Sequence, residues 1–206
     1  MHPTLEVRWF FRGRLPEEFY RWFPEAGADK PETRTDWYLY SPDRGLGIKL
    51  REGGLEIKQR LANQGKSKLA KRVRGRVEQW LKWHFPIEQT ADGAMAELGE
   101  SWMPVAKKRW CQHYAFTPDG AIQRVDSEDS EELMQQGCTL ELSELQVWNQ
   151  DWHSLCFEAF GPPEMLDQIL TNTVQQVHHE IGLPVLKARD SFGYPAWLHW
   201  VRQKAP

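Results

Sequence analysis

Short runs in which apolar and charged residues strictly alternate recur along this chain, and they constrain its fold more than any other feature. The stretch GLGIKLREGGLEIKQR, residues 45–60, holds two of them, IKLR and LEIK, on either side of a Glu-Gly-Gly turn. Side chains in a β-strand point to opposite faces at every second residue, so this spacing predicts a hairpin with one apolar and one charged face. The charged face can lie in bulk water or line an enclosed cavity.

Similar patterns predict further strands, joined mostly by short turns. We expect strands over residues 4–11, 36–42, 105–116, 121–125, 138–148 and 153–161. The basic segment 66–85 fits both a helix and a strand, because its valines are four apart while its arginines are two apart; its neighbours favour the strand. The total is about eight strands, which predicts an antiparallel α+β fold and allows a barrel.

The helices expected from the sequence are few. Pro162 and Pro163 open one long helix over residues 164–181, whose apolar positions share one face and which ends at Gly182. Short helices are expected at 15–23 and in the aromatic tail 189–203. Segment 86–101 is expected to be a polar, partly helical connection, and segment 127–137 a short capped helix or an acidic loop.

Length and composition are those of an ordinary globular chain that forms one domain, or at most a domain with a small appendage. The 206 residues are 40% hydrophobic and 27% charged, and no apolar run is long enough to cross a membrane. The N-terminus lacks the apolar core of a signal peptide. Cys111, Cys138 and Cys156 form no CxxC pair, which argues against a disulfide framework or a zinc site and predicts a cytoplasmic location.

Charge is distributed very unevenly. Residues 44–84 contain twelve Lys or Arg against three Glu, whereas residues 119–167 contain twelve Asp or Glu against Arg124 alone. A basic half of this kind is suited to a polyanionic partner. The acidic half can neutralise it within the fold or supply carboxylates for a metal ion.

Cations and glutamates recur on one face of several predicted strands. The recurring basic positions are Arg8; Lys49 and Arg51; Lys58 and Arg60; Arg72, Arg74 and Arg76; and either Lys107 with Arg109 or Lys108. If these faces are solvated, the strands form a sandwich or an open sheet. If they line a closed barrel, the arginine forks suit phosphate oxygens, and interspersed glutamates suit a divalent ion bridging those phosphates.

The order and spacing of these residues resemble those of the CYTH superfamily, the triphosphate tunnel metalloenzymes, over nearly the whole chain. Glu6-x-Arg8 stands where the family has its ExExK strand, and Lys49-x-Arg51 where it has R-x-R. Lys58, an Arg-x-Glu element at residues 76–78, the basic run 107–109, the acidic strands and the closing SFGYPAWL follow in the family's order. The resemblance implies an antiparallel eight-stranded closed β-barrel with a few peripheral helices, formed by residues 1–206 as one CYTH-like domain.

The resemblance also implies an activity. The barrel would bind inorganic tripolyphosphate, a nucleoside triphosphate or thiamine triphosphate, and hydrolyse it with Mg²⁺ or Mn²⁺. The implied metal ligands are Glu6, Glu141 and Glu158, and Glu6 and Glu158 are the implied catalytic residues. The implied substrate-binding residues are Arg8, Lys49, Arg51, Lys58, Arg74, Arg76, Lys108 and Arg109.

The sequence departs from the family at positions that bear on catalysis. Thr4 replaces the first glutamate of the opening motif, and Phe160 stands where the last acidic strand would have its second glutamate. Arg8 stands where the family's opening motif has lysine, and Lys49 stands where its R-x-R motif has the first arginine. The reduced glutamate set leaves a second hypothesis open, in which the barrel binds phosphate chains, nucleotides or a protein without hydrolysing them.

Other partners are expected to be few. We expect a monomer or homodimer without a membrane partner. A third hypothesis, nucleic-acid binding through the basic stretch 66–76, is disfavoured by the net charge of −3 and by the lack of a known nucleic-acid motif.

Overall fold

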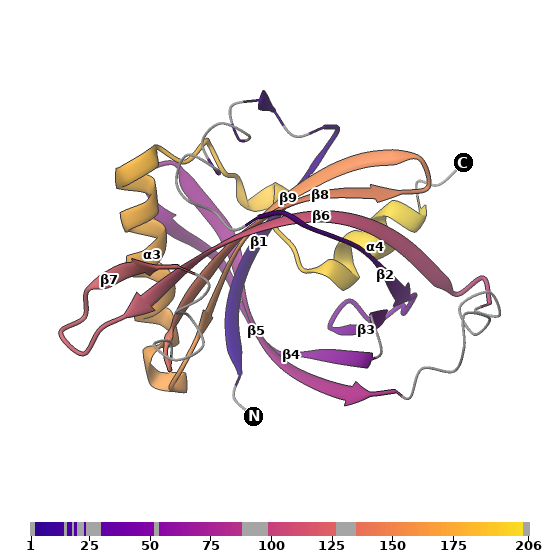
Figure 1. Ribbon diagram of the computed structural model, residues 1–206, viewed down its shortest axis with the longest axis horizontal. Coiled ribbons are helices and arrows are strands. Elements are labelled where there is room, and N and C mark those ends of the chain that lie inside the picture. Colours follow the sequence, from indigo (N-terminus) through magenta and orange to yellow (C-terminus); the bar gives the residue numbers. More distant parts are fainter. Residues whose placement is uncertain are drawn as a thin grey trace.

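A closed ring of antiparallel strands dominates the computed structural model of this protein (Figure 1). The structure describes residues 3–14, 16–17, 19, 23, 30–51, 54–87, 99–126 and 135–203. Much of the helix predicted over 15–23, of segments 86–101 and 127–137, and of the turn at 52–54 lies outside these residues. The strands are β1 (Thr4–Arg12), β2 (Glu32–Leu39), β3 (Leu46–Arg51), β4 (Gly54–Ala70), β5 (Val73–Pro86), β6 (Trp102–Phe116), β7 (Ile122–Val125), β8 (Gly137–Val147) and β9 (Gln150–Phe160).

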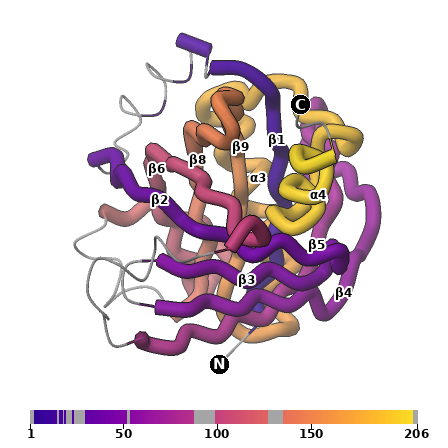
Figure 2. The backbone as a smooth tube through the Cα atoms, turned by 90° about the vertical axis from the view of Figure 1, so that its right-hand side faces the viewer, coloured from indigo at the N-terminus to yellow at the C-terminus, as the bar shows by residue number. Residues whose placement is uncertain are grey.

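Strand pairing closes the sheet into a barrel. Its order is β2-β3-β4-β5-β1-β9-β8-β6-β7, and an additional pairing of β2 with β6 joins the two sides. Strands β2 to β5 run side by side in Figure 2. Short β7 adds to the far end of β6, beyond the part that pairs with β2. The expected eight-stranded antiparallel barrel is therefore confirmed, with one extra strand.

The alternation read from the sequence separates an outer apolar face from an inner polar one. In β1, Leu5, Val7 and Trp9 are fully buried in the larger hydrophobic core, on the side covered by the long helix. Glu6 and Arg8 take the opposite face, since successive side chains of a strand alternate. Glu6 lies opposite Glu78 of β5 and Glu158 of β9, so the inner face brings charges from three strands together.

The hairpin at residues 45–60 and the basic segment after it both form strands. Lys49 of β3 pairs with Glu56 of β4, and Ile48 pairs with Ile57, as the alternation requires. Strands β4 and β5 form a long hairpin through Ala70 and Val73, which confirms the strand interpretation of 66–85 over the helical one.

Two helices cover different parts of the barrel. A 3-10 turn (Pro163–Met165) leads into α3 (Leu166–Ile181), which buries one apolar face outside the barrel and ends at Gly182 with φ +65°. A second 3-10 turn (Ala188–Asp190) precedes α4 (Tyr194–Gln203). Both the long helix and the short tail helix are confirmed. No helix among the described residues is both long and apolar enough to cross a membrane.

Helix α4 packs on the inner faces of the strands at one end of the barrel. Trp197, Leu198 and Val201 join a second core with inward residues such as Phe10 and Trp152. The Trp197 ring stacks on Phe10 at 4.7 Å between centroids. This end of the lumen is therefore filled by apolar side chains, and the polar part of the lumen lies next to it.

Candidate functional site

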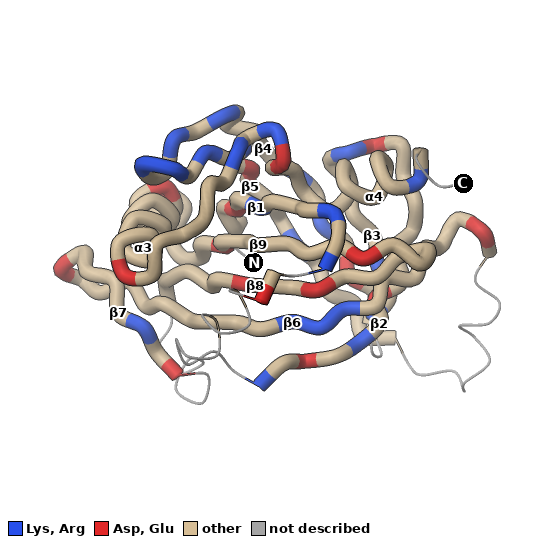
Figure 3. Tube along the Cα trace, turned by 90° about the horizontal axis from the view of Figure 1, so that it is seen from above, with Lys and Arg blue, Asp and Glu red and all other residues tan. Residues whose placement is uncertain are grey.

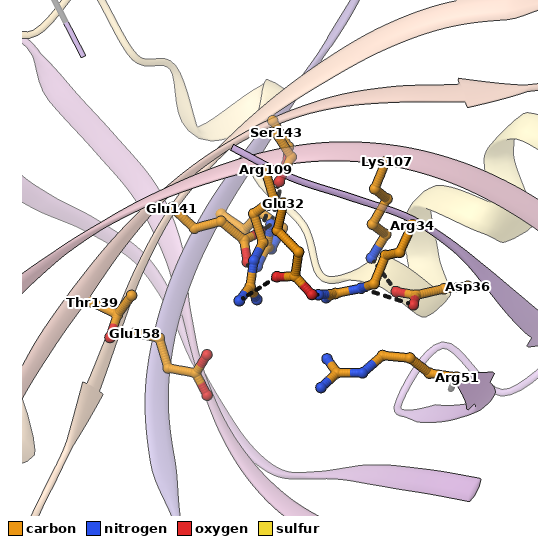
Figure 4. A network of polar contacts seen from close by, with 12 residues as sticks. Glu32, Arg34, Asp36, Arg51, Lys107, Arg109, Thr139, Glu141, Ser143 and Glu158 are labelled. Atoms are coloured by element: carbon orange, nitrogen blue, oxygen red, sulfur yellow. Dashed lines mark hydrogen bonds and ion pairs between the residues drawn. The ribbon is translucent and has the colours of Figure 1, made fainter. Parts of the chain in front are cut away.

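The inner face of the barrel surrounds a cavity of about 130 Å³. Side chains from strands β1 to β6, β8 and β9 and from the start of α4 line it. Its charged lining consists of eight cations, Arg8, Arg34, Lys49, Arg51, Lys58, Lys82, Lys107 and Arg109, and four carboxylates, Glu6, Glu56, Glu141 and Glu158. Figure 4 shows Arg51 and Glu158 pointing toward the middle of the barrel from opposite sides. The lining thus carries an excess of positive charge.

Asp36 is the anion at the centre of the deepest cluster. Its side chain has no exposed surface and lies 2.8 Å from Lys107 Nζ, 3.1 Å from Arg34 Nε and 3.6 Å from Lys49 Nζ. Burial alone would raise the pKa of Asp36, but the attraction of Lys107 and Lys49 holds it well below its usual range. Asp36 is therefore a fixed negative charge that keeps three cations in place.

The two lysines of this cluster are poorly solvated. Burial lowers the pKa of Lys107 to about 8, although Asp36 and Glu141 oppose the shift. Burial and repulsion by Lys107 lower the pKa of Lys49 to about 8 as well. Because burial disfavours the charged form of a lysine, an added anion in the cavity stabilises both ammonium groups.

A second cluster forms around Glu141. Its carboxylate accepts a 2.6 Å hydrogen bond from Arg8 and lies 3.4 Å from Arg109. Burial alone would raise the pKa of Glu141, but Arg8 and Arg109 hold it well below its usual range. Glu32 bridges Arg109 to Arg34, which links this cluster to Asp36 (Figure 4).

Lys58 connects two glutamates on neighbouring strands. Its ammonium group pairs with Glu6 and lies 3.6 Å from Glu158. Burial would raise the pKa of Glu158, but Lys58 and Lys82 lower it. The side chains of Lys58, Glu158, Arg51 and Arg109 remain about one-third exposed, so these four reach the accessible part of the cavity.

Aromatic side chains flank the cations. The Tyr194 ring lies 4.2 Å from Lys107 Nζ and 4.8 Å from the Arg8 guanidinium carbon. Its buried hydroxyl has no hydrogen-bond partner among the residues that the structure describes. This hydroxyl belongs to a cavity-lining residue and can donate to an anion placed beside it.

Eight of the residues predicted from the sequence meet in the cavity. They are Glu6, Arg8, Lys49, Arg51, Lys58, Arg109, Glu141 and Glu158. Three others lie elsewhere. Arg74 is exposed near the end of the β4–β5 hairpin, Arg76 lines a separate recess, and Lys108 lies 5.0 Å over the Trp110 ring and lines a groove outside the barrel.

The reasons for these three placements are geometric. Lys108 has neighbours at 107 and 109 that face inward, so the alternation of the strand turns Lys108 outward. Arg74 and Arg76 share the inner parity of β5, but they lie toward its hairpin end, past Glu78, which pairs with β1.

Several cavity residues were missed by the sequence reasoning. Arg34 and Tyr38 line the cavity, and Asp36 is buried between them in sequence. The three occupy alternate positions of the TRTDWYL stretch, so the same two-residue period was available as a signal for them. Lys82 and Glu56 continue the alternation of β5 and β4 in the same way. The complete burial of Asp36 could not be predicted from the sequence, because it depends on the closure of β2 onto β6.

The three glutamates implied as metal ligands do not form a metal site in this arrangement. Glu6 and Glu158 share Lys58, while Glu141 is bound by Arg8 and Arg109. Across the described parts of the chain, no group of three or more His, Cys, Asp or Glu side chains is placed to hold a metal ion. As arranged, all three glutamates are held by cations. Mg²⁺ or Mn²⁺, which takes one or two carboxylates beside substrate phosphates and waters, fits here only if it displaces those cations.

Comparisons with known proteins bear on the fold only. No protein-family model and no curated protein matches the chain. A solved structure of the PH1819 protein from Pyrococcus horikoshii OT3 is similar, with a TM-score of 0.50 and 13% sequence identity, over 98% of this chain and 99% of that one. The similarity supports the barrel architecture along the whole chain.

Proposed function

We propose that the barrel cavity binds a small molecule through its triphosphate chain. The observation that carries this proposal is the convergence of eight Lys and Arg side chains, from six strands, on one cavity with four carboxylates in its lining. Arginine guanidinium groups match phosphate oxygens with two parallel hydrogen bonds. Inorganic tripolyphosphate, a nucleoside triphosphate and thiamine triphosphate all present such a chain.

The arrangement divides the cations into two roles. Arg51, Lys58 and Arg109 are partly exposed and can exchange their present contacts for a ligand's oxygens. Lys107 and Arg34 are almost fully buried and are held by Asp36. The buried pair fixes the positive potential of the cavity, and the exposed three make the adjustable contacts.

Binding is the function that this donor set supports best. Metal-assisted hydrolysis, which the family resemblance implies, needs carboxylates free of cations. Glu6 and Glu158 would both have to leave Lys58 to serve as ligands. Removing a buried carboxylate from its cation costs several kcal/mol unless another charge replaces it. Hydrolysis is therefore tested as a separate activity.

Thermal shift and calorimetry with tripolyphosphate test the proposal. At a ligand concentration of about 100 Kd the folded state gains about 2.7 kcal/mol. Arg51→Gln removes one charge-assisted contact worth about 1.5–3 kcal/mol, so its affinity falls about 10-fold to 100-fold. Arg124→Gln, on exposed β7, is the matched control and keeps wild-type affinity.

The outcomes separate the alternatives. No thermal shift with tripolyphosphate, ATP or thiamine triphosphate, or equal losses in both variants, would overturn the proposal. Phosphate release that needs Mg²⁺ or Mn²⁺, stops with EDTA and is lost in Glu158→Gln would add hydrolysis to binding. A thermal shift without phosphate release leaves the protein a binder.

A further inference from the structure

The β4–β5 hairpin places like charges directly opposite each other. In its register Lys66 faces Arg76 and Lys68 faces Arg74. No register shift separates the two pairs, so all four cations lie on one face of the hairpin; we call them the basic ladder. Like charges directly opposite on neighbouring strands destabilise a sheet. Charge in the ladder therefore does not stabilise the hairpin, and a polyanionic partner would relieve the repulsion.

The hairpin segment around the ladder holds no carboxylate. Residues 61–77 contain six Lys or Arg and no Asp or Glu. Lys66, Lys68 and Arg74 are exposed and Arg76 is half-buried. Within the described part of the chain, no ion pair involves a ladder residue. Figure 3 shows Lys and Arg positions following one another along β4 at the end that lies beside α3.

The ladder leads into a recess that is separate from the barrel cavity. Arg76 belongs to the ladder and also lines the recess, which has a volume of about 430 Å³. Three more arginines line the recess: Arg44, Arg60 and Arg189. Among the described residues that line it, Glu78 is the single acidic one, and it is bound to Arg60 at 2.6 Å.

Aromatic rings form part of the recess wall. Phe192 and Trp200 line it together with His199, and all three are partly exposed. Planar rings beside arginines suit a planar ligand group that is attached to phosphate.

We propose that the basic ladder and the recess bind single-stranded nucleic acid. The phosphates follow the ladder, and a base enters the recess against its aromatic wall. A groove of cations with adjacent rings is how proteins bind single strands without sequence preference. From Arg60 to Lys68 the strand extends roughly 25 Å, at about 3.3 Å per residue, which is longer than a mononucleotide. A flat acidic membrane would reach the ladder and leave the recess empty.

The proposal does not depend on the function of the barrel cavity. The probe is a single-stranded uridine homopolymer with a 5′-hydroxyl end and a 3′ fluorophore, which offers no triphosphate to the cavity. Fluorescence anisotropy gives its affinity for the full chain between about 50 and 200 mM salt. Each phosphate contact contributes about 0.7 to the slope of log K against log salt for single strands.

The ladder variant is Lys68→Gln with Arg74→Gln. Its salt slope is expected to fall by about 1.4, and its affinity to fall with it, since two contacts are lost. Arg12→Gln with Arg124→Gln removes the same charge from exposed positions on β1 and β7 and is expected to leave binding unchanged. The ladder variant should melt at or above the wild-type temperature, because its substitutions relieve repulsion; this shows that the loss is not unfolding.

Four results would overturn the proposal. These are no binding at about 50 mM salt, equal losses in the two variants, a ladder-dependent association with phosphatidylserine vesicles in place of the oligonucleotide, and equal affinity for an abasic strand of the same length. Equal affinity for the abasic strand would show that no base binds in the recess.

Discussion

Asp36 shows how a single buried anion can organise a basic cavity. Three cations from β2, β3 and β6 reach it, and its side chain is completely inaccessible. Its charge costs desolvation energy, which the three cations offset. The arrangement places Lys107 and Lys49 where they face the lumen without depending on a ligand to hold them.

Replacing Asp36 by Asn is expected to destabilise the protein by about 3–5 kcal/mol. The substitution keeps the shape of the side chain but leaves buried Lys107 without its nearest counter-charge, and breaking a buried pair from one side costs about this much. Urea unfolding measures it as a lower midpoint with an unchanged m-value.

Asp126→Asn is the control, since Asp126 is exposed and surface changes usually stay within about 0.5 kcal/mol. A loss below about 1 kcal/mol in Asp36→Asn would show that Asp36 does not hold the cluster.

Which residues face the lumen was predictable where the alternation was unambiguous. Glu6, Arg8, Lys49, Arg51 and Lys58 follow directly from the two-residue period and all line the cavity. The run at 107–109 has three consecutive cations, so the period alone leaves the register open by one residue. A one-residue slip turns every side chain of a strand to the other face, and the pairing of β6 with β2 and β8 decides it.

At the scale of elements, Gly75 explains why a glycine interrupts the basic strand β5. A Cβ atom there would collide with Val7 and lie 2.7 Å from Cζ2 of the Trp9 ring. Trp9 Nε1 also donates a 2.9 Å hydrogen bond to the carbonyl of neighbouring Arg74. The missing side chain therefore lets β1 and its indole pack closely against β5.

Gly75→Ala is expected to destabilise the fold by about 1–3 kcal/mol, the usual cost of overpacking a well-filled core. Chemical denaturation followed by tryptophan fluorescence gives the change. Gly99→Ala is the matched control, because a Cβ at Gly99 meets no atom within 4 Å. If both substitutions cost the same, the close packing of Trp9 on β5 is not what requires glycine.

The positions of the two described α-helices were not equally predictable. Helix α3 has its prolines, its apolar face and its terminal glycine in the sequence, so its bounds could be read directly. The short aromatic helix α4 could be expected on the body of the protein. The packing of α4 on the inner faces of the strands could not be predicted from the sequence. It depends on residues such as Phe10, Met103 and Trp152, which come together only when the barrel closes.

For the whole molecule, closure turns the uneven charge of the sequence into a local balance. The basic half contributes β3, β4 and β5, and Glu141 and Glu158 of the acidic half face their cations across the lumen. Of the eight acidic residues of segment 119–167 that the structure describes, these two line the cavity, so most of the described ones do not neutralise it. The positive excess that remains is the basis of the proposed anion binding.

The excess of positive charge in the cavity predicts that the protein takes up protons when it binds an anion. Lys49 and Lys107 have pKa values of about 8, below the usual value near 10.4, so above pH 8 they lose their protons in the unliganded barrel. A bound triphosphate favours their charged form and raises both pKa values. Affinity should therefore fall as pH rises above 8, about tenfold per pH unit for each proton taken up.

The direction of the pH dependence of stability distinguishes this loss of affinity from unfolding. Between about pH 8 and 10.4 the unfolded chain binds more protons at these two lysines than the folded chain, so their contribution to stability rises with pH while affinity falls.

Calorimetry of tripolyphosphate binding at about pH 7 and about pH 9, in buffers with different ionisation enthalpies, counts the protons. Uptake is expected at the higher pH and little at the lower. Lys49→Arg keeps a permanent positive charge in β3, so it should bind with about one proton less at the higher pH. Equal proton uptake in Lys49→Arg and the wild type would show that Lys49 is not among the groups that the anion protonates.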